Sequence, residues 1–68
     1  MRSVLLRTFP ARRGEIGLFI LCLEEGIEIQ IRAWRPDAAS AWRVLPRQSD
    51  GISITQLGQA LIESYLNQ

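Results

Sequence analysis

The chain has 68 residues, 47% of them apolar, and eight basic against seven acidic residues give a formal net charge of +1. This length accommodates one domain, residues 1–68, and the apolar content excludes a disordered segment. The charge lacks the strongly basic balance of a non-specific nucleic-acid binder.

So short a chain buries only roughly 60% of its unfolded surface. Cys22 is the only cysteine and histidine is absent, which excludes an intrachain disulfide and the usual Cys/His zinc site. We therefore expect no metal, no cofactor, and support from self-association as a homodimer.

All eight basic residues are arginine. The planar guanidinium grips phosphate at two points and stacks on flat rings, although the base composition of a GC-rich genome explains the absence of lysine equally well. The longest nearly uncharged run, residues 16–23, is far shorter than the ~20 residues that span a bilayer. The N-terminus lacks the apolar core of a signal peptide. We expect no membrane association and a cytoplasmic protein, with nucleoid association compatible with the sequence.

The first predicted strand is residues 4–9, and Pro10 ends it because proline cannot donate to a ladder. Residues 11–14 read as a turn that exposes Arg12 and Arg13. These arginines are either part of a solvated loop or phosphate contacts at the rim of a binding surface.

The run from residue 15 to residue 23 is apolar on both faces, which predicts a strand covered on both sides, with the second cover supplied by a helix or by another subunit. Cys22 within it is expected to be a buried small side chain rather than a nucleophile. The turn at residues 24–26 predicts an antiparallel hairpin with residues 27–34.

The strand at residues 27–34 alternates strictly. One face carries Ile27, Ile29, Ile31 and Ala33, and the other carries Glu28, Gln30, Arg32 and Trp34. Charge beside a flat aromatic suits a phosphate and a stacked base. The alternatives are that Trp34 packs under the following loop and that Arg32 pairs with a carboxylate such as Glu15 or Glu28.

Residues 41–47 are predicted to form a further short strand or an ordered arm, in which Trp42 serves core or dimer packing. Residues 48–51 are a strong turn signal, and residues 52–54 a brief extended segment. An amphipathic helix of about three turns follows, with Thr55, or alternatively Ser53 with Gln56, as its cap. Its apolar positions are Ile54, Leu57, Leu61, Ile62, Tyr65 and Leu66.

Catalysis is not expected. Histidine and lysine are absent, the seven acids show no spacing that forces two together, and no glycine-rich phosphate loop is present.

Two motifs resemble a known family. Residues 29–37, Ile-Gln-Ile-Arg-Ala-Trp-Arg-Pro-Asp, resemble the strand Ile-Arg-x-Trp-x-Pro-Asp of the positive-cofactor-four type transcriptional coactivators, especially their short bacterial members. Residues 51–54, Gly-Ile-Ser-Ile, resemble the Gly-Ile-Ser-Leu segment that leads into the family's C-terminal helix. The order of the motifs also agrees, over about residues 13–65.

The resemblance implies an α+β fold: a curved four-stranded antiparallel sheet with one C-terminal helix, paired into a homodimer that binds single-stranded or melted DNA. By the same resemblance Arg32 contacts phosphate, Trp34 stacks a base, and Arg12 and Arg13 lie in the basic first turn. The expected nucleic-acid-binding residues are Arg12, Arg13, Arg32, Trp34, Arg35, Arg43 and Arg47. Asp50 stands where the family usually has a basic residue, which affects the expected affinity more than the fold.

The sequence thus predicts a non-enzymatic protein that binds single-stranded nucleic acid, DNA rather than RNA, in transcription regulation or DNA maintenance. The alternative is a small dimeric protein-interaction module whose arginines solubilise it or meet an acidic partner.

Overall fold

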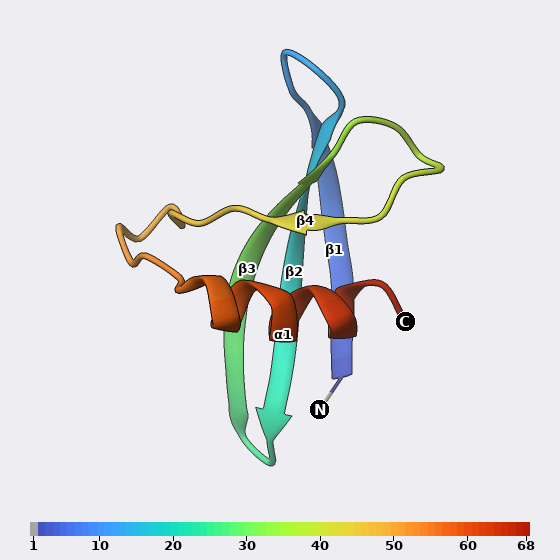
Figure 1. Ribbon diagram of the computed structural model, residues 1–68. Helices are drawn as coiled ribbons and strands as arrows, with labels where there is room; N and C mark the ends of the chain where they lie inside the picture. Colours follow the sequence, from blue (N-terminus) through green and yellow to red (C-terminus); the bar gives the residue numbers. More distant parts are fainter. Residues whose placement is uncertain (1) are drawn as a thin grey trace.

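A computed structural model of the chain describes residues 2–68. The elements follow the order β1 (Arg2–Pro10), β2 (Glu15–Glu24), β3 (Ile27–Arg35), β4 (Arg43–Val44) and α1 (Gln56–Leu66). The strands form one antiparallel sheet in the order β1-β2-β3-β4, and α1 crosses one face of it (Figure 1). The predicted α+β class, with four antiparallel strands and a C-terminal helix, is confirmed. Residues 41–47 were predicted to form a short strand or an ordered arm, and each description holds in part. Two residues form β4, and the rest of the segment is irregular.

The cross-strand register divides the sheet into a covered and an uncovered face. Phe19 lies opposite Leu5 on β1 and Ile31 on β3, and Phe19 and Ile31 are buried. Because side chains alternate along a strand, Leu18 and Ile20 point to the other face, where they are half-buried. β2 was predicted to be covered on both sides, and within one chain α1 covers only one of them.

Trp42 belongs to the core beneath α1, which settles the alternatives left open by the sequence. Its side chain is 6% exposed and meets Phe19 edge to face, with ring centroids 5.2 Å apart. Gly17 makes room for the indole, since a Cβ at that position would lie 2.7 Å from Trp42 Cη2. The buried residues of this core are Phe19, Leu21, Ile31, Ala33, Trp42, Val44 and Leu66.

The helix is too short to cover the whole sheet. Its 11 residues rise about 16 Å, whereas the ten residues of β2 extend about 33 Å. Ile31 and Ala33 are buried, but Ile27 and Ile29 remain 48% and 39% exposed. The predicted inner face of β3 is therefore buried only in the half that α1 reaches.

Side chains of α1 close the free edge of β4. Asn67, the C-cap of α1, accepts from Trp42 N–H at 2.7 Å and donates to its carbonyl at 2.9 Å. One and two turns earlier, Glu63 accepts from Val44 N–H at 2.8 Å and Gln59 donates to the Val44 carbonyl at 3.0 Å. These groups satisfy backbone that would otherwise offer an unpaired edge.

Thr55 caps α1, as predicted, with its hydroxyl accepting from Gly58 N–H at 3.1 Å. The apolar positions of the helix divide between two directions. Leu66 is buried and Ile62 packs against the core, but Leu57 and Leu61 are 82% and 56% exposed. Two of the six predicted apolar positions, Leu57 and Leu61, therefore face away from the chain's own sheet.

Candidate nucleic-acid interface

The face of the sheet opposite α1 carries two rows of side chains that cross the strands. The register aligns Arg7, Leu18 and Arg32 in one row. The next row, one pleat closer to the β1–β2 turn, aligns Phe9, Ile16 and Trp34 and continues to Arg43 on β4. We call this surface the outer face; it consists of Arg7, Phe9, Ile16, Leu18, Arg32, Trp34 and Arg43.

Trp34 is half-buried on this face and is fixed at one edge. Its indole Nε1–H donates to the Arg13 carbonyl at 2.5 Å. This bond ties the ring to the β1–β2 turn. Beyond the ring, an open groove of about 620 Å³ runs past Arg43 and Pro46 to Gln59 of α1. An anchored indole beside an open groove offers a flat surface whose orientation is set before a ligand arrives.

Gly14 holds the β1–β2 turn against the end of β3. Its φ is +80°, and a Cβ there would overlap the Arg35 carbonyl oxygen and lie 2.7 Å from Pro36 Cα. Only glycine permits both this backbone conformation and this approach. The turn thereby brings the exposed Arg12 and Arg13 beside Trp34, so the structure places these predicted residues together.

Arg32 is held through its backbone by Gln48. The Gln48 side-chain oxygen accepts from Arg32 N–H at 2.6 Å, and its Nε2 donates to the Arg32 carbonyl at 3.2 Å. The Arg32 side chain donates from Nη2 to the Arg47 carbonyl at 3.4 Å. Within residues 2–68 its Nε has no acceptor, and the carboxylate partner considered from the sequence is not found there.

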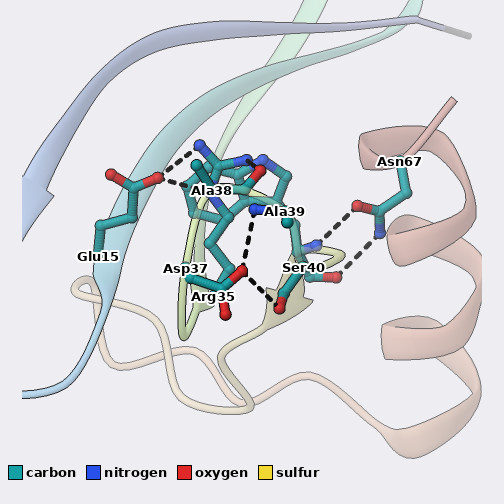
Figure 2. Close-up of polar contacts among 8 residues, drawn as sticks. Glu15, Arg35, Asp37, Ala38, Ala39, Ser40 and Asn67 are labelled. Carbon is teal, nitrogen blue, oxygen red and sulfur yellow. Dashed lines mark hydrogen bonds and ion pairs between the residues drawn. The ribbon is translucent and has the colours of Figure 1, made fainter.

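Arg35 lies apart from the outer face. Its guanidinium pairs with Glu15 at 2.5 Å and lies 4.2 Å over the Trp42 ring. Figure 2 shows Arg35 between Glu15 and the loop at residues 37–40. Of the predicted arginines, this one is occupied by contacts that close the rim of the core.

The remaining predicted arginines flank the outer face. Arg43 lies opposite Trp34 in the register, and the exposed Arg47 lies next to Arg32 through its carbonyl. Within residues 2–68 the Arg35–Glu15 pair is the one ion pair. Arg12, Arg13, Arg32, Arg43 and Arg47 thus carry positive charge that no carboxylate of the described chain neutralises directly.

Arg7 and Phe9 belong to the outer face and were not predicted. Arg7 lies with its guanidinium carbon 4.7 Å from the centre of the Phe9 ring. A bulge at Leu6 shifts the register between Leu5 and Arg7. Without that extra residue, strict alternation would place Arg7 and Phe9 on the face of α1, because one inserted residue reverses the direction of every side chain beyond it.

Charge is distributed unevenly along the sheet. The end at the β1–β2 turn carries Arg12 and Arg13, whereas Glu24, Glu25 and Glu28 lie at or beside the β2–β3 turn. These two turns lie at opposite ends of the sheet (Figure 1). The near-neutral net charge of the chain therefore includes a basic turn at one end of the sheet and, at the other end, an acidic turn that also has Arg2 beside it.

The fold and this face define a small α+β protein with an open sheet and a basic, aromatic surface. No protein-family model matches the chain, and no curated protein or solved structure matches it. Among the described residues, no helix has the length and apolarity needed to cross a membrane.

Proposed function

We propose that the protein binds single-stranded or melted DNA without catalysing a reaction, and that it acts in transcription regulation or DNA maintenance. The observation that carries the proposal is Trp34, an anchored and half-exposed indole that is bonded to the backbone of Arg13 and lies opposite Arg43 on an uncovered sheet face. A base stacks on such a ring regardless of its identity, because every base has a π-face. The resemblance to the positive-cofactor-four coactivators favours DNA over RNA as the ligand.

Phosphate contacts are assigned to the arginines that flank this ring. Arg12 and Arg13 lie in the turn that contacts the ring, and Arg43 lies opposite it on β4. Arg32 lies in the neighbouring row, and Arg47 lies beside Arg32. Each phosphate that is neutralised on a single strand contributes about −0.7 to the slope of log K against log salt. Contacts from all five arginines would therefore give a slope of about −3.5.

Fluorescence titration with oligo-dT tests the proposal. We expect quenching of Trp34 at low salt and an affinity that falls steeply as salt rises, while the buried Trp42 supplies a constant background. Trp34→Ala should weaken binding by roughly 1–3 kcal/mol, measured by anisotropy of a labelled oligonucleotide. Thr8→Ala, an exposed change on β1, is the matched control.

An absence of quenching and of anisotropy change at low salt would refute nucleic-acid binding. Tighter binding of oligo-rU than of oligo-dT would instead overturn the assignment to DNA. Trp34→Ala removes one exposed hydrogen bond, worth about 0.5–1.5 kcal/mol, and the packing of the half-buried part of the ring. A loss of stability of about 3–5 kcal/mol, as for a fully buried tryptophan, would therefore make Trp34 a core residue.

We also propose that two copies associate as a homodimer. Leu57 and Leu61 lie one turn apart on α1, and with Ile52, 63% exposed, they present apolar surface that this chain does not cover. A second copy would remove this surface from water at a gain of roughly 25 cal/mol per Å². Light scattering at micromolar concentration should give a dimer mass, and Leu57→Ser should lower it. Thr8→Ala, an exposed change on β1, is the control, and a monomer mass for the unchanged protein would contradict the proposal.

The second candidate function is a small dimeric protein-interaction module that receives an acidic partner. The uneven distribution of charge favours it, because an unpaired basic end attracts any polyanion. Salt-sensitive binding of polyglutamate together with no binding of oligo-dT would select this function over DNA binding.

A further inference from the structure

The groove beside Trp34 is also lined by polar side chains of α1. Trp34 of β3, Arg43 of β4, and Gln59 and Glu63 of α1 all border its volume of about 620 Å³. Gln59 and Glu63 are four residues apart on the helix, so they are neighbours on one helix face, with Cβ atoms about 5–6 Å apart. Only the short strand β4 separates β3 from these side chains, and one strand spacing is about 4.8 Å. A base that stacks on Trp34 can therefore reach groups on α1.

The backbone of β4 determines which ends of these two side chains stay free. Gln59 donates from Nε2 to the Val44 carbonyl at 3.0 Å, so the amide is oriented with its oxygen away from that bond. The half-buried Glu63 accepts from Val44 N–H through Oε2 at 2.8 Å. Within residues 2–68, the Gln59 Oε1 and the Glu63 Oε1 accept no other hydrogen bond. The groove is therefore bordered by two neighbouring acceptors.

The Glu63 carboxylate makes this groove unsuitable for a phosphate. Among the described residues it takes part in no ion pair, so its negative charge would repel the backbone of a nucleic acid. The edge of a base carries no charge, and its N–H groups form strong hydrogen bonds to a carboxylate. The groove therefore suits a base edge, while the phosphates lie with the arginines of the outer face.

Guanine is the base whose edge matches two neighbouring acceptors and a cation. Its Watson–Crick edge presents N1–H and the N2 amino group side by side, and an unpaired base can be read on that edge. Thymine presents a single N–H there, and adenine and cytosine each present one amino group beside a ring nitrogen that accepts. The O6 and N7 acceptors of guanine are the usual partners of an arginine, and Arg43 borders the same groove.

We propose that this groove selects an unpaired guanine. The base stacks on Trp34, its N1–H and N2 amino group donate to Glu63 and Gln59, and Arg43 donates to O6. This inference rests on the proposed function and adds a base preference to stacking, which by itself has none. In a duplex the same edge is paired with cytosine, so only an unpaired guanine can meet these groups.

Anisotropy of labelled oligonucleotides of about eight residues tests the preference. The set is oligo-dT and the same strand with one central guanine, adenine or inosine. We expect the guanine to tighten binding roughly 5- to 150-fold over oligo-dT, the range for one two-point base contact. Inosine, which lacks the N2 amino group, should bind between the guanine strand and oligo-dT, and adenine within about threefold of oligo-dT. Equal affinity for the guanine and adenine strands would overturn the selection and leave the proposed function standing, whereas no binding of any strand refutes the proposed function itself.

The variant Glu63→Gln assigns the preference to this groove. The introduced amide can still accept from Val44 N–H, but it places an NH2 group where guanine needs an acceptor. We expect the ratio of guanine to oligo-dT affinity to fall to about one, while the affinity for oligo-dT itself is kept or rises because a negative charge is lost. A purely structural role of Glu63 would weaken both strands equally. Glu25→Gln, the same change at an exposed site in the β2–β3 turn, should leave the ratio unaltered. A guanine preference that persists in Glu63→Gln would overturn the assignment.

Discussion

Replacing Gln48 is the most direct perturbation of the framework that holds Arg32 in place. Gln48 is a polar side chain that is only 7% exposed. Its amide makes three hydrogen bonds, to Arg32 N–H, the Arg32 carbonyl and the Leu45 carbonyl, at 2.6, 3.2 and 2.6 Å. The side chain thereby extends the sheet beyond the point where the two-residue strand β4 ends.

The expected loss follows from the groups that Gln48→Ala leaves behind. The Arg32 carbonyl keeps a partner, because Leu45 N–H donates to it at 3.2 Å. Arg32 N–H and the Leu45 carbonyl lose the bonds to Gln48. An unsatisfied buried group costs about 1–3 kcal/mol, and water reaches these half-buried positions in part, so we expect about 2–4 kcal/mol. At roughly 4–8 °C per kcal/mol for a domain of this size, the melting temperature should fall by about 10–25 °C.

Thermal melting by circular dichroism measures this loss. The variant Gln48→Glu tests whether the donor and acceptor of the amide are both needed or whether any polar side chain suffices. The introduced carboxylate still accepts from Arg32 N–H but faces two carbonyl oxygens that need a donor. Its folded-state pKa is therefore raised above the unfolded value, so the variant should gain stability relative to the unchanged protein as pH falls from 7 toward 4. A melting temperature for Gln48→Ala within about 4 °C of the unchanged protein, or a Gln48→Glu penalty independent of pH, would refute the reasoning.

Two further changes test the close approach at the β1–β2 turn and the closed edge of β4. Gly14→Ala should cost about 2–4 kcal/mol and weaken oligo-dT binding, because strain at positive φ adds to overlap with the Arg35 carbonyl. Gly26→Ala has the same φ and open space around it, so it should cost only about 1–2 kcal/mol, and equal losses for the two variants in chemical denaturation would contradict the close approach. Asn67→Ala should cost about 1–2 kcal/mol and speed hydrogen exchange at Trp42 N–H, whereas Gln68→Ala should do neither; unchanged exchange at Trp42 would show that the edge is closed by other means.

Elements with a strong local pattern were predictable from the sequence. The strict alternation of residues 27–34 identifies a strand and assigns its faces. The three- and four-residue spacing after Thr55 identifies a helix and its cap. Both signals depend only on neighbours in the chain, where the period of the backbone determines which side chains share a face.

Features that depend on contacts distant in sequence were not predictable. Gln48 lies in a turn, as expected, but nothing in the residues shows that its amide substitutes for a strand partner of Arg32, 16 positions away. The bulge at Leu6 leaves no mark in an apolar run, and it decides which face receives Phe9. The ion pair between Arg35 and Glu15 could not be predicted for the same reason, because the register of β2 and β3 brings the two residues together.

The near-neutral net charge argues against nucleic-acid binding only if acids lie within electrostatic reach of the outer face. Glu28 lies six residues from Trp34 along β3, a separation of about 20 Å at 3.3 Å per residue. Glu24 and Glu25 lie at the same distant end of the sheet. The Debye length at physiological ionic strength is about 8 Å, so more than two screening lengths separate these carboxylates from a phosphate bound at Trp34. These three carboxylates would therefore contribute little to binding except at low salt, whereas Glu63, which lines the groove beside Trp34 and Arg43, lies closer and opposes the attraction of the arginines.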